Sequence, residues 1–178
     1  ETVRGNQRYL QPMKPFRAFL GTAVAVATLA SNHIASADAL GPGDSIVPVP
    51  TGDPVVVGAE EASVEVDFLS LDLKGTLISK VISGDTGNPL GGLTFIYEIV
   101  LDAASPHAVS RLSVSDFSTV DVDINYEADG VEEIVPFAAD RGAEDGAVIG
   151  FYFPFGTGLP PGETSALLVI RTDAEAYV

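Results

Sequence analysis

A row of acidic and amide side chains between Asp121 and Glu132 is the closest approach of this sequence to an ion-binding pattern. Oxygen-bearing side chains fill positions 1, 3, 5, 7, 9 and 12 of an EF-hand-like frame, namely Asp121, Asp123, Asn125, Glu127, Asp129 and Glu132. Ca²⁺ takes roughly six to eight oxygen ligands, so the spacing is suggestive. The frame needs glycine where Tyr126 stands, and Val122 and Ile124 alternate with the acids as in a strand. We expect no EF-hand, and looser calcium binding, here or by the loop 140–145, stays an alternative.

Carboxylate pairs are the second chemical feature, because glycoside hydrolases use two acids that face each other across a cleft. Glu65 and Asp67 share one face of a predicted strand, as do Asp121 and Asp123. Acids are frequent enough for such pairs to arise by chance. Only Glu98 stands in an apolar strand, where burial would raise its pKa, although an outer-face or edge position suits it better. A carboxylate-dependent hydrolase is therefore the most remote hypothesis.

The sequence gives little support for nucleophilic catalysis, metal binding by thiolates or phosphate binding. His107 is the one histidine after the N-terminal segment, and its neighbour Pro106 is typical of a loop. There is no Gly-x-Ser-x-Gly motif, and the lack of cysteine excludes disulfides and thiolate metal sites. The glycines of 84–92 lack the helix and lysine of a phosphate-binding loop. We predict no enzyme, no cofactor, and no catalytic, cofactor-binding or metal-binding residue.

An aromatic cluster provides a possible sugar-stacking platform. It consists of Phe151, Tyr152, Phe153 and Phe155. Since neighbouring side chains of a strand point to opposite faces, about half of the cluster should belong to the core. A carbohydrate-binding or calcium-binding β-sandwich module is accordingly the second hypothesis.

The elements that would position these residues are short strands separated by turns. Period-two alternation or apolar runs predict about seven strands, at 63–69, 76–82, 93–101, 111–117, 120–126, 148–153 and 164–172. The run 93–101 is the most apolar and is predicted to be central, whereas 140–146 is predicted to be a charged loop. No helical stripe is present. The spacing is typical of a β-sandwich or a barrel, and we predict an all-β fold, an antiparallel β-sandwich over 61–178.

The N-terminal part predicts export. Met13 to Arg17 is short and basic, 18–30 is an uncharged apolar run of 13 residues, and Ala35-Ser36-Ala37 fits the pocket of signal peptidase. A membrane span needs about 20 residues, so none is expected. We interpret 13–37 as a signal peptide, 1–12 as an upstream or non-native segment, and 38–60 as an extended Pro- and Gly-rich linker with a possible edge strand at 55–57.

The charge limits the classes of partner that are expected. The net charge is −16, and residues 38–178 hold five basic against 24 acidic side chains. Nucleic acids and anionic membranes attract clustered Lys and Arg, so neither is an expected partner. The expected partners are signal peptidase and the secretion machinery.

Four stretches resemble the body of exported bacterial proteins that carry the PEP-CTERM sorting signal. They are Gly91 to Glu98, Arg111 to Phe117, Gly150-Phe151 and Pro160 to Ala174, within a resemblance that covers 75–178. It implies a secreted or cell-surface protein of a bacterial extracellular matrix, with extracellular polysaccharide as a possible partner. The sorting tail itself (Pro-Glu-Pro, an apolar span and a basic end) is missing from these residues, so handling by an exosortase would need a tail beyond Val178. The first hypothesis is therefore a non-catalytic structural or interaction protein of such a matrix.

Overall fold

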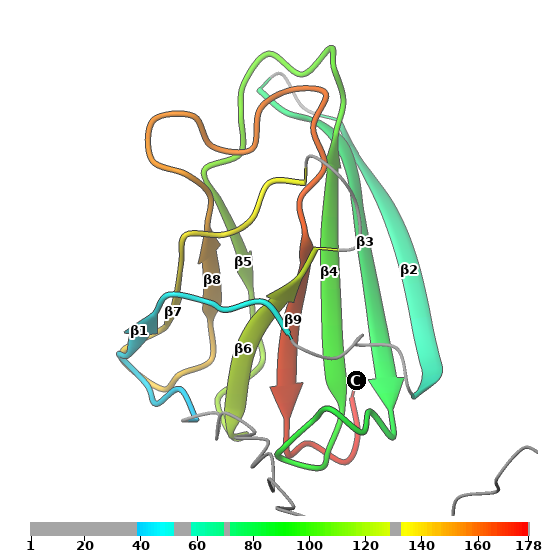
Figure 1. Ribbon diagram of the computed structural model, residues 1–178, viewed down its shortest axis with the longest axis vertical. Helices are drawn as coiled ribbons and strands as arrows, with labels where there is room; N and C mark the ends of the chain where they lie inside the picture. Colours follow the sequence, from blue (N-terminus) through cyan, green and yellow to red (C-terminus); the bar gives the residue numbers. More distant parts are fainter. Residues whose placement is uncertain (1–38, 52–57, 70–71, 129–132, 178) are drawn as a thin grey trace, which may run out of the picture. The chain divides into compact units, whose positions relative to one another are not determined.

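The computed structural model describes residues 39–51, 58–69, 72–128 and 133–177, and within them the chain is all-β. Two antiparallel sheets face each other, which confirms the predicted β-sandwich (Figure 1). The five-stranded sheet has the order β2(Ala59–Leu69), β3(Lys74–Ser83), β4(Thr94–Leu101), β9(Leu167–Thr172) and β6(Val122–Glu127). The four-stranded sheet has the order β1(Ser45–Ile46), β7(Ala138–Arg141), β8(Ile149–Tyr152) and β5(Arg111–Val114).

All seven predicted strands are present in the structure, with shifted ends. The apolar run that was predicted to be central is β4, the middle strand of the larger sheet. Its alternation is visible in the burial of its side chains, because Ile99 and Leu101 point into the core while Glu98 and Val100 lie on the outer face.

Two strands of the structure, β1 and β7, were not predicted. Asp140 and Arg141, assigned to a charged loop, belong to β7, whose Ala-Ala-Asp-Arg sequence carries little β propensity and is held by pairing with β8. β1 lies in the predicted linker and pairs with β7. Leu40 is 3% exposed and packs in the core, so the sandwich begins before residue 61. The segments 1–12 and 13–37 and the suggested strand at 55–57 lie outside the described residues.

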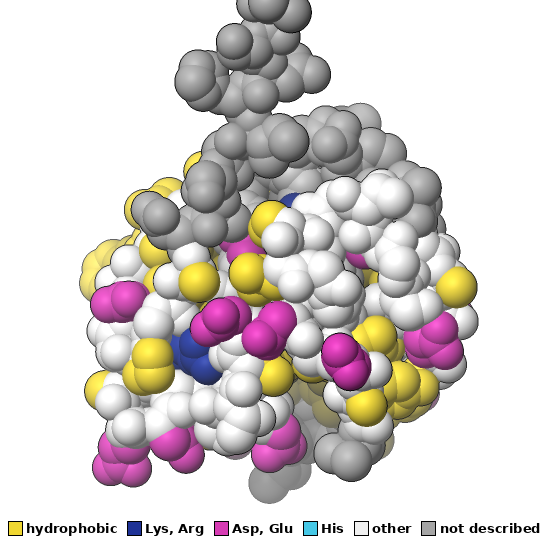
Figure 2. Space-filling view, turned by 90° about the horizontal axis from the view of Figure 1, so that it is seen from below, with side chains coloured by type: hydrophobic (Ala, Val, Ile, Leu, Met, Phe, Trp, Pro, Cys, Tyr) yellow, Lys and Arg dark blue, Asp and Glu magenta, His cyan; other side chains and the backbone are white. Residues whose placement is uncertain are grey.

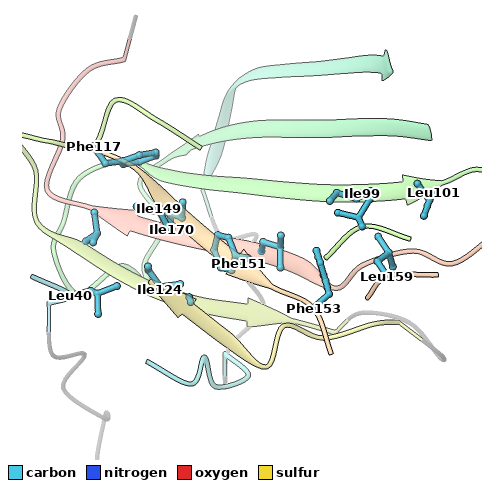
Figure 3. Close-up of a cluster of buried hydrophobic side chains, with 14 residues drawn as sticks. Leu40, Ile99, Leu101, Phe117, Ile124, Ile149, Phe151, Phe153, Leu159 and Ile170 are labelled. Carbon is cyan, nitrogen blue, oxygen red and sulfur yellow. The ribbon is translucent and has the colours of Figure 1, made fainter. Parts of the chain in front are cut away.

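The core fills the space between the two sheets (Figure 3). Phe151 and Ile149 of β8 meet Ile124 and Ile170 of β6 and β9, while Phe117 packs edge-on against Phe95 with ring centroids 5.4 Å apart. Burying each large apolar side chain contributes about 1.5–3 kcal/mol. The four-stranded sheet thus has a firmly held inner face, and its outer face is free to carry a site.

Arg141 is buried at one end of this core, and backbone carbonyls surround its guanidinium group. Nε donates to the oxygen of Gly146, Nη1 to that of Leu40, and Nη2 to those of Phe117 and Val120, at 2.6–2.9 Å. A buried charge is tolerated only when its donors are satisfied. Arg141 therefore ties the N-terminal lead and two loops to β7.

A second buried cation lies on the outer face of the larger sheet. Arg171 Nε is 3.2 Å from Asp85 Oδ2, and the side chains are 8% and 1% exposed. Thr94 donates its hydroxyl to the same oxygen, and the Gly87 amide donates to the other. The turn at 84–89 is therefore anchored to β9 through Asp85.

The surface is acidic, as the composition predicts. Figure 2 shows acidic side chains scattered over one end of the molecule, with few basic atoms among them. In the described part of the chain, no helix is long and apolar enough to cross a membrane.

Candidate functional site

A tight turn after β8 projects Phe155 into solvent. The amides of Thr157 and Gly158 both donate to the carbonyl oxygen of Pro154. Gly158 has φ +63°, and a Cβ atom there would lie 2.7 Å from the carbonyl oxygen of Val109. Glycine is thus required both for the backbone conformation and for the close approach. The turn leaves Phe155 98% exposed.

Phe155 borders a shallow pocket of about 370 Å³ on the outer side of the four-stranded sheet. The pocket is lined by residues 154–158 of the turn and by aromatic and small residues, namely Phe137, Tyr152, Phe153, Ala108 and Ser110. Among the described residues that line it, none is an Asp, a Glu or a His.

Phe137 and Tyr152 are two neighbouring aromatic residues that line the pocket. Their ring centroids are 6.4 Å apart at an interplanar angle of 61°. The Phe137 amide donates to the Tyr152 carbonyl, which fixes the two residues side by side. Phe137 remains 46% exposed, so its ring is available to a ligand. Exposed apolar surface gathered in one patch is a mark of a binding site.

A charged pair contacts the side chain of Tyr152. The Tyr152 hydroxyl donates to Asp140 Oδ2 at 2.7 Å, and Arg111 Nη2 donates to Asp140 Oδ1 at 2.8 Å. The Arg111 guanidinium carbon lies 4.9 Å from the Tyr152 ring centroid, within cation–π range. Gly150 makes room for it, because a Cβ atom there would lie 2.2 Å from Arg111 Nη2. Tyr152 is thereby held in one orientation.

The protonation states of this group are set by the same contacts. Partial burial raises the pKa of Asp140, but the hydrogen bonds from Tyr152 and Arg111 and the charge of Arg111 outweigh it, so the pKa is lowered overall. The bond to Asp140 is the main reason why the pKa of Tyr152 is raised. At neutral pH the Tyr152 side chain that lines the pocket is therefore a neutral phenol. It contacts the ion pair of Arg111 and Asp140, whose charges compensate each other.

The predicted aromatic cluster divides as alternation requires. Phe151 and Phe153 are 0% and 2% exposed and belong to the core, whereas Tyr152 and Phe155 are more exposed and line the pocket, which Phe153 also borders. Sequence reasoning missed Phe137 and Arg111, which come from other parts of the chain. The registers that bring Phe137, Tyr152 and Arg111 together are pairings of β7 and β5 with β8, and a single sequence does not show them.

The EF-hand-like frame of acidic residues does not form a loop in its described part, because β6 runs from Val122 to Glu127. Asp123 is 6% exposed, accepts a hydrogen bond from Asn125 and lies opposite Arg171 in the β6–β9 register. Asp129 and Glu132 lie outside the described residues. Within the described ranges, no three His, Asp or Glu side chains gather as a metal site would require.

The remaining candidates are not among the residues that line the pocket. Glu98 is on the outer face of β4 and partly exposed, as its pattern favoured. Glu65 and Asp67 share the outer face of β2, and Asp67 accepts a hydrogen bond from Thr76. His107 is an exposed loop residue. None of these side chains lines the aromatic pocket.

Comparisons of the chain with protein families, with curated proteins and with solved structures find no match.

Proposed function

We propose that this chain is a non-catalytic binding domain whose aromatic pocket holds a neutral polysaccharide. The observation that carries the proposal is the side chain of Phe155, which is fully presented to solvent beside Phe137 and Tyr152. A Phe side chain buried in the core would stabilise the fold by about 1.5–3 kcal/mol. Because Phe155 is exposed and does not make this contribution, its position indicates a role in ligand binding.

The ligand class follows from the shape and charge of the pocket. Sugars with equatorial hydroxyls expose flat patches of C–H groups, and these patches stack on aromatic rings. Arg111 is already neutralised by Asp140, and the chain carries a net charge of −16, so acidic polysaccharides are repelled. A neutral, β-linked glycan of glucose, xylose or N-acetylglucosamine type is the best fit.

The pocket is better suited to binding than to hydrolysis. Glycoside hydrolysis needs two carboxyl groups about 5–9.5 Å apart, one of which keeps a raised pKa to act as an acid. Asp140, which accepts a hydrogen bond from the pocket residue Tyr152, has a lowered pKa, and both of its oxygens already accept side-chain hydrogen bonds.

The proposed location is the cell surface or extracellular matrix of a bacterium. Its support is the signal-peptide pattern at 13–37 and the resemblance to PEP-CTERM proteins. A polysaccharide-binding pocket would give such a protein a means to attach to the matrix.

Affinity electrophoresis in gels with soluble polysaccharides tests the proposal. We expect β-glucan, xylan or glycol chitin to slow the wild-type chain, and Phe155→Ala to migrate almost as in a plain gel. The loss of one stacking ring corresponds to about a tenfold weaker Kd, or about 1.4 kcal/mol.

Tyr177→Ala is the matched control, because Tyr177 is also an exposed aromatic residue but does not line the pocket. It should bind like the wild type. Equal retardation of the wild type and Phe155→Ala, or no retardation in any of the three gels, would contradict the proposal.

A further inference from the structure

The strand β2 forms an open edge of the five-stranded sheet. It pairs antiparallel with β3 along its length except for an irregularity at Glu61, and among the described residues no strand pairs with its other side. Figure 1 shows β2 at one margin of the molecule. An edge strand presents a row of backbone N–H and C=O groups to which another strand can be added.

Two valines make this edge apolar on the side that faces the core. Val64 and Val66 lie opposite Ser79 and Leu77 of β3, and Leu77 packs against the core cluster. Each valine is nevertheless 52% exposed. In Figure 1 the strands of the smaller sheet lie on the side of the molecule away from β2. The apolar stripe therefore continues beyond the sandwich.

The opposite face of β2 is acidic. Glu65 and Asp67 lie on it, opposite Ile78 and Thr76. Glu60 and Glu61 precede them, and the strand contains no basic residue. An added strand would thus meet apolar side chains on one face and carboxylates on the other.

We propose that β2 is a docking edge for an extended, cationic segment of another protein, in which apolar residues alternate with Lys or Arg. The backbone pairing would extend the sheet, the apolar residues would cover Val64 and Val66, and the basic residues would face Glu65 and Asp67. This surface is separate from the aromatic pocket, because none of its residues lines that pocket.

Charge argues against a second copy as the occupant. Two-fold antiparallel pairing of β2 with its own copy would bring Glu65 and Asp67 against acids on the same face of the partner. Two chains of net charge −16 also repel each other at long range.

A capped peptide of ten residues with alternating Lys and Val is a suitable probe for titration into the full chain. We expect saturable binding in about 50 mM salt, with at least tenfold slower hydrogen exchange at alternate amides of β2. The same peptide N-methylated at every residue keeps its side chains but cannot donate backbone hydrogen bonds, and it should not bind.

Two double variants separate the apolar and the ionic contribution. Val64→Thr with Val66→Thr keeps β-branched side chains and should weaken binding about tenfold. Glu65→Gln with Asp67→Asn should weaken it by a similar factor and reduce its salt dependence. The matched control Glu144→Gln with Asp145→Asn removes the same charge from an exposed loop after β7 and should change Kd less than about twofold.

Three results would overturn the proposal. No binding in low salt would mean that the acids of β2 only protect the edge from pairing. Equal binding of the N-methylated peptide would mean attraction by charge without strand addition. Self-association of the chain that is abolished by the two threonine substitutions would assign the edge to a second copy.

Discussion

Three arginines of the described chain have three different environments. Arg111 pairs with Asp140 at the surface, Arg171 pairs with buried Asp85, and Arg141 donates to four carbonyls without a carboxylate. In a chain with few basic residues, each of these side chains holds a particular loop or strand in place. Their substitutions should therefore have very different effects on stability.

Arg141→Met should destabilise the fold by about 3–5 kcal/mol, because four carbonyl oxygens lose their donor in a buried setting. Arg111→Met, at a partly exposed pair, should cost about 1 kcal/mol or less. Denaturant unfolding measures both free energies. A loss of less than about 1 kcal/mol for Arg141→Met would show that the buried network contributes little.

Ionisation of Asp123 should lower the free energy of unfolding as the pH rises. Burial raises the pKa of Asp123 above its ordinary value of 3.8, and Arg171 and Asn125 offset only part of this effect. Because the folded chain binds this proton more tightly than the unfolded chain, the contribution is greatest below pH 3.8 and is lost as the pH rises through the folded pKa.

The side chain of Asp123→Asn is neutral at every pH. The free energy of unfolding of this variant, relative to that of the wild type, should therefore increase as the pH rises. Urea unfolding at several pH values from below 3.8 to neutral measures the difference. Asp121→Asn is the control, since Asp121 is exposed. Parallel curves for the wild type and Asp123→Asn would refute the assignment.

At the scale of elements, the turn that follows β8 depends on its second glycine more than on its first. Gly156 and Gly158 both have positive φ, but a Cβ atom at Gly156 meets nothing within 4 Å, whereas one at Gly158 meets the Val109 carbonyl at 2.7 Å. Gly156→Ala should cost about 1 kcal/mol and Gly158→Ala about 2–3 kcal/mol. Thermal or urea unfolding gives the order, and the reverse order would contradict this account of the turn.

The strands that could be predicted from the sequence are those with a clear apolar alternation, such as β2, β4 and β6. β7 could not be predicted, because Ala138 to Arg141 forms a strand only through its pairing with β8 and β1. The same limit applies to the pocket. Alternation separated Phe151 from Tyr152, but the contribution of Phe137 depends on a strand register that only the folded structure shows.

At the scale of the whole molecule, charge repulsion opposes folding. Residues 38–178 carry 24 acidic and only five basic side chains. Added salt screens this repulsion more in the compact state than in the unfolded chain. The Tm should therefore rise by a few degrees between about 20 and 300 mM NaCl. Calorimetry at neutral pH measures it, and a constant or falling Tm would show that self-repulsion is not significant.

The central claim is that the aromatic pocket binds a neutral glycan, and the most direct test is an NMR titration of the ¹⁵N-labelled chain with β-linked oligosaccharides of glucose, xylose and N-acetylglucosamine. We predict that the amide shifts perturbed by at least one of them cluster at Phe137, Tyr152 and the 154–158 turn, and that they disappear in Phe155→Ala. The absence of perturbation with all three sugars, or perturbation centred on another surface, would contradict the claim.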